Sequence, residues 1–169
     1  MDIGELLLDL FGRVDEHVGE ALDGLAPEHL TATVAPGVNT IAWLVWHLTR
    51  VQDHHVSELL DAEQVWVTGD WGPRVGVVSD PDNTGYGHEP DEVLAIRPES
   101  ADVLRGYHDA VSRRTVEYLR GLTPADLDRV VDRRWDPPVT LGVRLISVAD
   151  DDIQHAGQAA FARGVLERS

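Results

Sequence analysis

The sequence has no cysteine, no lysine and no long hydrophobic run. Without cysteine, the chain cannot form disulfide bonds, bind a metal through thiolates or use a cysteine nucleophile. No stretch approaches the roughly 18 consecutive apolar residues that a membrane-spanning helix needs. The first residues also lack a basic segment followed by a long apolar one, so we expect no signal peptide. These absences predict a soluble, cytoplasmic protein.

Basic residues are scarce as well, and the formal net charge is −16 at pH 7. The acidic residues are spread along the chain instead of forming one tail. Such a surface repels nucleic acids and anionic membranes, so we expect neither as a partner. All 14 basic residues are arginine, which we interpret as the codon bias of a high-GC bacterial genome.

The apolar residues recur at spacings of three and four in four segments, which predicts an all-α protein. The 169 residues fit one domain, residues 1–169, which is large enough to bury a core. Asn39 or Thr40 can cap the second helix, and Thr140 can cap the fourth. The predicted helices cover residues 3–22, about 40–60, about 99–120 and about 140–164. Four such helices with long crossover connections make a four-helix bundle.

Residues 64–98 differ in composition from the predicted helices. They are rich in glycine, proline and aspartate, and they contain the run DNTGYGHEP. A loop insertion this long inside a compact domain is uncommon and is often functional. Two interpretations stay open: Tyr86 and His88 close over the mouth of the bundle, or they pack on its surface as ordinary loop residues.

The last predicted helix carries the strongest candidate for chemistry, in the run ADDDIQHAGQ. Asp151 and His155 are four residues apart, which places both side chains on one helix face with their Cβ atoms about 6 Å apart. That spacing suits a carboxylate and an imidazole that bind one metal ion. The same pair is often only a surface hydrogen bond, so a metal needs support from another helix. Gln158 lies on the same face.

The rest of this helix is predicted to divide into an apolar and a solvated side. Asp150 and Asp152 point elsewhere around the helical wheel and are interpreted as solvated charges. The residues predicted to face inward are Leu141, Leu145, Val148, Ala149, Ile153, Ala160 and Phe161.

The helix at about 40–60 offers three further histidines in the run WHLTRVQDHH: His47, His54 and His55. On a helical wheel, His55 falls near the centre of the apolar stripe, while His47 and His54 lie at its edge. A lone histidine on an apolar face is more often a core residue than a ligand. The spacing alone therefore leaves the choice between His47 and His55 open.

Together these segments resemble the DinB-like, or YfiT-like, superfamily of metal-dependent four-helix-bundle proteins. The resemblance covers nearly the whole chain. It is carried by NTIAWLVWHL at 39–48, DNTGYGHEP at 82–90 and DDIQHAGQAAFARG at 151–164. In that superfamily, a histidine before a leucine early in the second helix and two residues four apart in the last helix bind a divalent metal.

Carried over residue by residue, the resemblance implies that His47, Asp151 and His155 are the metal ligands. Asp151 departs from the commonest pattern, because many members of the superfamily have histidine at this position. Two histidines and one carboxylate are still a recognised ligand set with open positions for water or substrate. The set favours Zn, Ni, Mn or Fe(II) without choosing among them.

The branch that the chain looks most similar to contains thiol S-transferases and isomerases that use bacillithiol or mycothiol. The lysine-free, high-GC character favours mycothiol. The resemblance therefore implies a metal-dependent transferase that joins a low-molecular-weight thiol, mycothiol or a similar cosubstrate, to a small electrophile. In such an enzyme, His55, His54 or Gln158 can orient the nucleophile or transfer a proton.

Other functions stay open from the sequence. One is a non-catalytic metal- or ligand-binding bundle involved in stress response, and another is a metal-dependent hydrolase that needs water and no thiol. Dimers are common among similar proteins, so a homodimer is a further expectation.

Overall fold

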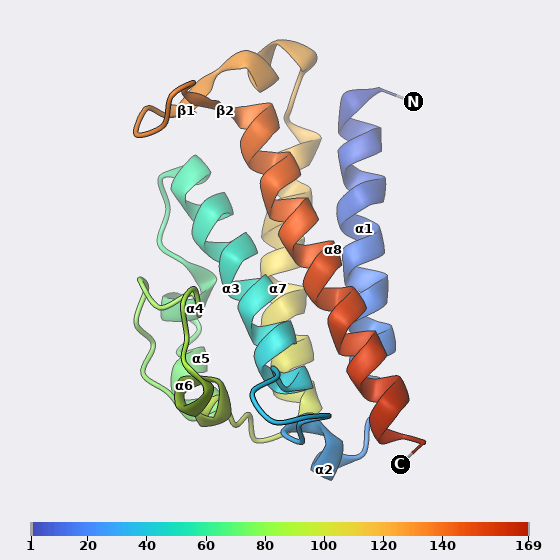
Figure 1. Ribbon diagram of the computed structural model, residues 1–169. Coiled ribbons are helices and arrows are strands. Elements are labelled where there is room, and N and C mark those ends of the chain that lie inside the picture. The colour runs from blue at the N-terminus through green and yellow to red at the C-terminus, as the bar shows by residue number, and fades with distance from the viewer. Residues whose placement is uncertain (1, 169) are drawn as a thin grey trace.

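Four long helices lie side by side in the computed structural model, which describes residues 2–168 (Figure 1). α3 packs against α7 and α8, and α1 packs against the same two helices. α1 and α8 run in one direction, whereas α3 and α7 run in the other (Figure 1). The helices are α1 (Ile3–Leu22), α3 (Ile41–Leu60), α7 (Ala101–Arg120) and α8 (Leu141–Leu166). This arrangement confirms the predicted all-α bundle with long crossover connections.

Two threonine side chains mark where α3 and α8 begin. The Thr40 hydroxyl accepts a hydrogen bond of 3.0 Å from the backbone N–H of Trp43 at the start of α3. The Thr140 hydroxyl accepts one of 3.4 Å from the backbone N–H of Val143 at the start of α8. Each cap satisfies an N–H group that has no partner within the first helical turn. Thr40, and not Asn39, is therefore the residue that caps α3.

Segment 64–98 contains three short helices and packs beside α3 (Figure 1). These are α4 (Val65–Thr68), α5 (Trp71–Val75) and α6 (Pro90–Ala95). The buried Asp53 carboxylate on α3 anchors the start of the segment, because it accepts hydrogen bonds of 2.9 and 2.7 Å from the backbone N–H groups of Val65 and Trp66. The anchor is distant in sequence, which explains why local composition did not predict these helices.

Smaller elements lie at the two ends of the bundle. α2 (Pro27–Leu30) is at the end where α3 begins (Figure 1). The 3-10 helix η1 (Pro124–Asp128) and the antiparallel pair β1 (Val130–Asp132) and β2 (Val139–Thr140) lie at the opposite end, where α8 begins. Among residues 2–168, no helix combines the length with the apolar character that crossing a membrane requires.

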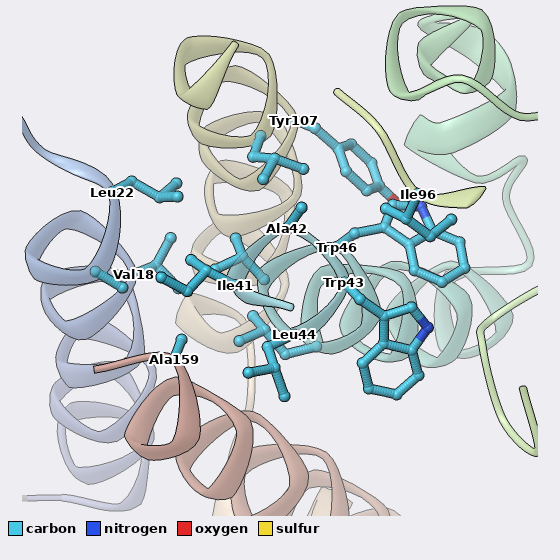
Figure 2. Packing of buried hydrophobic residues seen from close by; sticks show 14 of the residues in the cluster. Val18, Leu22, Ile41, Ala42, Trp43, Leu44, Trp46, Ile96, Tyr107 and Ala159 are labelled. Atoms are coloured by element: carbon cyan, nitrogen blue, oxygen red, sulfur yellow. The ribbon is translucent and has the colours of Figure 1, made fainter. Parts of the chain in front are cut away.

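The core consists of two hydrophobic clusters. Along α1, Leu7 and Phe11 belong to one cluster, and Val14 and Val18 belong to the other. Figure 2 shows the cluster that contains Val14 and Val18, in which the first turns of α3 pack among α1, α7 and α8. Trp46 of α3 points the other way, toward segment 64–98 (Figure 2). The helix that carries His47 is therefore covered on both sides.

The prediction of which α8 residues face inward was wrong at several positions. Ile153, Ala160 and Phe161 are exposed, whereas Asp152, expected to be solvated, has no exposed surface. The buried face follows the three- and four-residue spacing from Leu145, and this spacing reaches position 152 whatever residue stands there. The buried residues of α8 are Leu141, Leu145, Val148, Ala149, Asp152, Ala156, Ala159 and Ala162.

Candidate metal centre

α3 and α8 bring His47, Asp151 and His155 together between them. The Nε2 atom of His47 lies 3.9 Å from Asp151 Oδ2, and the Nε2 atom of His155 lies 3.7 Å from Asp151 Oδ1. One potential ligand atom from each of the three residues lies within 4.8 Å of the other two. The two imidazole rings meet edge to face, with their centroids 4.7 Å apart.

Hydrogen bonds at the other ring nitrogen define the tautomer of both histidines. His47 Nδ1 donates to the backbone carbonyl of Thr84. His155 Nδ1 donates to the side-chain carbonyl of Gln158 at 3.0 Å. A carbonyl oxygen can only accept, so each Nδ1 carries the proton and each Nε2 presents its lone pair to the space beside Asp151. Metal-bound histidines in proteins are held in the same way.

Burial keeps His47 neutral. Its side chain is buried, and the Trp43 ring stacks on it with the centroids 4.5 Å apart. Loss of solvent around the imidazolium lowers the pKa of His47, and this outweighs the opposing effects of the Thr84 hydrogen bond and the Asp151 charge. A neutral imidazole is the form that binds a metal.

The three residues fit a small divalent ion. Asp151 Oδ2 is buried and has no hydrogen-bond partner within the described chain, and such an atom costs free energy unless something binds it. In a tetrahedral site with metal–ligand bonds of about 2.1 Å, the ligand atoms lie about 3.4 Å apart. His47 Nε2 lies 3.9 Å from Asp151 Oδ2 and His155 Nε2 lies 3.7 Å from Asp151 Oδ1, so each histidine is near that separation from a different oxygen of the carboxylate.

Gly85 allows the Thr84 carbonyl to approach His47. Its φ angle is +91°, which disfavours any side chain. A Cβ atom at this position would lie 2.8 Å from Trp46 Cζ3 and 2.9 Å from His47 Nδ1. Only glycine therefore fits between the loop and α3.

His55 lies outside this triad and contacts an arginine. Arg144 Nη1 is 3.2 Å from His55 Nδ1, and the same guanidinium donates to Asp132 of β1 at 2.9 Å. Burial, and next the Arg144 charge, lower the pKa of His55 to about 4. His54, His55 and Glu58 also come within 4.8 Å of one another, but a permanent positive charge beside His55 opposes a cation there.

A cavity of about 340 Å³ joins the two histidine clusters. α3 and α8 form two of its walls, and the loop before α6 forms the third. Its lining includes His47 and Asp151 at one side and His54 and His55 at another. A ligand in this cavity can reach His47, Asp151 and His55 together.

The loop residues Tyr86 and His88 behave differently from each other. Tyr86 lines the cavity, but 93% of it is exposed, so it lies at the rim. His88 ties the loop to the bundle: its Nδ1 accepts a hydrogen bond of 3.1 Å from Trp43 Nε1, and its Nε2 is 2.9 Å from Asn83 Oδ1. His88 is thus a structural residue of the loop in this conformation.

Comparison with known proteins places this geometry in a family. A family model described as mycothiol-S-transferase matches residues 6–167. The chain belongs to this family. The resemblance to the DinB-like superfamily that the motifs predicted is confirmed.

A solved structure supports the fold of this mycothiol-S-transferase family member. The crystal structure of a conserved protein from Enterococcus faecalis is 27% identical and superposes with a TM-score of 0.90. The match covers 100% of this chain and 99% of the other. Among curated proteins, none matches the chain.

Sequence reasoning missed the two residues that support His47. Thr84 acts through its backbone carbonyl, and Trp43 acts through its ring face, so neither residue type points to a metal site. One signal was available in Arg50, a charged residue one helical turn after His47 in a strongly apolar helix. Its side chain is completely buried and contacts the loop that carries Thr84.

Proposed function

We propose that the chain binds one divalent metal ion through His47, Asp151 and His155, and that it transfers a low-molecular-weight thiol of the mycothiol type to a small electrophile. The observation that carries the metal site is the pair of Nε2 lone pairs directed toward one carboxylate, with both Nδ1 protons already used. Membership in the mycothiol-S-transferase family supports the reaction type. A divalent ion at this position supplies a Lewis acid that favours the thiolate form of a bound thiol near neutral pH.

The chain's own residues bind and orient the reactants. Because the sequence has no cysteine, the nucleophilic sulfur belongs to the cosubstrate. The cavity beside the triad accommodates it, and His55 in the cavity wall orients it through a hydrogen bond. With a pKa of about 4, His55 stays neutral near pH 7 and is a weak proton acceptor. Gln158 holds the ring of His155 in place.

The first experiment measures metal in the purified protein. Elemental analysis and calorimetric titration with Zn²⁺, Ni²⁺ and Mn²⁺ should find one site per chain. His47→Ala and His155→Ala should each abolish that site, because two ligands remain. His55→Ala is the matched control on the same helix and should keep it. A folded wild-type protein that binds none of these ions contradicts the proposal.

The second experiment tests the reaction with metal-loaded protein. Mycothiol is mixed with a panel of small electrophiles, and the S-conjugate is measured by mass spectrometry. Turnover should require both the metal and the thiol, and His47→Ala should lower it at least 100-fold if the metal is essential. Hydrolysis of a substrate without thiol would instead identify a metal-dependent hydrolase. Ligand binding without turnover would identify a non-catalytic binding protein.

A further inference from the structure

Arg50 has an unusual set of partners for a buried arginine. It lies on α3 one turn after His47, and its side chain has no exposed surface. The nearest carboxylate, that of Asp53, is 3.5 Å away from Nη1. Its shorter hydrogen bonds go to neutral oxygens, namely the Pro81 carbonyl at 3.0 Å, the Asn83 carbonyl at 3.1 Å, the Gln64 amide at 2.8 Å and the Tyr107 hydroxyl at 3.1 Å.

Two of these partners lie in the loop that supports His47. Pro81 and Asn83 lie three residues and one residue before Thr84, whose carbonyl accepts the His47 Nδ1 proton. The Asn83 side chain stabilises the same loop, because its Oδ1 accepts a hydrogen bond of 3.1 Å from the backbone N–H of Gly85. Arg50 and His47 therefore hold one short loop through three of its backbone carbonyls, those of Pro81, Asn83 and Thr84.

We propose that Arg50 is a positioning residue for the metal centre, which holds the loop at 81–85 so that the Thr84 carbonyl keeps the His47 proton on Nδ1. In this tautomer the Nε2 lone pair faces Asp151. Without the carbonyl, the ring is free to take the other tautomer, in which Nε2 carries the proton and cannot bind a metal. The functional meaning of this role rests on the proposed metal site, whereas the tautomer is a property of the metal-free protein.

Charge and burial support a precise role for this arginine. A guanidinium presents several N–H donors in a fixed plane, so one side chain can bind several carbonyls in a defined geometry. A buried arginine is also costly unless its donors are satisfied. The loop carbonyls satisfy two of them, which couples the stability of Arg50 to the position of the loop.

The test measures the tautomer directly. Long-range ¹H–¹⁵N correlation spectra of ¹⁵N-histidine-labelled, metal-free protein at pH 7.5 should show His47 with its proton on Nδ1. Arg50→Met removes the donors and should give a mixture of tautomers, together with at least a 10-fold loss of Zn²⁺ affinity. Arg50→Lys should give an intermediate result, because one ammonium cannot bind every carbonyl.

Two further variants separate positioning from general destabilisation. Arg114→Met removes another arginine that binds backbone near the loop, at the Glu63 carbonyl just before segment 64–98 (2.7 Å), and should leave the His47 tautomer unchanged. Gly85→Ala keeps Arg50 but pushes the loop away from His47 Nδ1, and should shift the tautomer as Arg50→Met does. If Arg50→Met does not fold, Arg50→Lys tests the arginine itself, and Gly85→Ala tests whether the position of the loop controls the tautomer.

The outcomes distinguish this proposal from the proposed function. A His47 tautomer that is unchanged in Arg50→Met and Gly85→Ala overturns the positioning role, even if metal affinity falls. If the tautomer shifts in these variants but the wild-type protein binds no metal, the positioning role is supported. The proposed metal site is then contradicted.

Discussion

At the scale of single residues, the two histidines of the candidate metal centre differ in what holds them. His47 is buried and bound to a backbone carbonyl, whereas His155 is bound to the side chain of Gln158 on its own helix. A side-chain partner can be removed by one substitution without moving the backbone. Substitution of Gln158 therefore tests directly how much its hydrogen bond to His155 contributes to metal affinity.

We predict that Gln158→Leu weakens Zn²⁺ binding about 10-fold, because hydrogen-bond partners of metal-bound histidines typically contribute 10- to 100-fold in affinity. Calorimetric titration measures the effect. Gln154→Leu is the matched control, since Gln154 lies on the same helix and bonds to Asp150 at 2.9 Å, away from the triad. Equal affinities for the two variants would show that Gln158 does not support the site.

The sequence predicted the α8 side of the candidate centre better than the α3 side. Asp151 and His155 are brought together by helical spacing alone, which is a local property. The choice between His47 and His55 depended on the family resemblance, because a helical wheel identifies a ligand only on a helix with one apolar face. α3 has 14 buried residues among its 20, so its apolar stripe does not mark the side that faces α8.

At the scale of elements, α8 carries an acidic residue into the core. Asp152 lies between Ala149, which belongs to one hydrophobic cluster, and Ala156, which belongs to the other. Neither of its carboxylate oxygens has a hydrogen-bond partner among residues 2–168. Burial, and next the charge of Asp151, raise the pKa of Asp152 well above its usual range. An unpartnered carboxyl at this depth lowers the stability of the folded state.

We predict that Asp152→Asn makes the metal-free protein more stable at pH 8. The unfolded chain ionises this residue near pH 4, while the folded chain resists ionisation, so the wild type loses stability as the pH rises above about 4. The advantage of the variant should grow with pH by at most about 1.4 kcal/mol per unit. Urea unfolding at pH 4.5, 6 and 8 measures it.

Asp150→Asn is the control for this experiment, because Asp150 is exposed on the same helix. It should follow the wild-type profile across the pH range. If Asp152→Asn loses as much stability between pH 4.5 and pH 8 as the wild type does, the carboxyl is not the cause of the loss.

Segment 64–98 shows why some elements escaped prediction. Its short helices depend on partners in α3, such as the Asp53 carboxylate that binds the N–H groups of Val65 and Trp66. Local sequence preferences cannot reveal an anchor on another helix, so the four long helices were predicted and the short ones were not.

At the scale of the whole molecule, the net charge of −16 affects the stability of the entire fold. Repulsion among surface carboxylates disfavours the compact state, and salt screens it over a Debye length of about 10 Å at 0.1 M. We predict that raising NaCl from 20 to 300 mM increases the free energy of unfolding by about 1 kcal/mol, or the melting temperature by about 2–4 °C. Calorimetry measures the change.

KCl at the same ionic strength should give the same increase, because screening does not depend on the identity of the cation. A melting temperature that stays constant or falls with both salts would mean that repulsion among the acidic residues hardly lowers the free energy of unfolding.

The way in which the loop at 81–85 is held has a consequence for how this protein can diversify. Arg50 and His47 bind it through the carbonyls of Pro81, Asn83 and Thr84, and every residue type supplies a carbonyl. Asp82 and Thr84 of this loop, and Tyr86 directly after it, line the cavity. Substitutions at these three positions can therefore change which small molecules fit the cavity. Gly85 and the hydrogen bonds to the loop carbonyls stay the same. Natural selection can reshape the cavity in this way without rebuilding the support of His47.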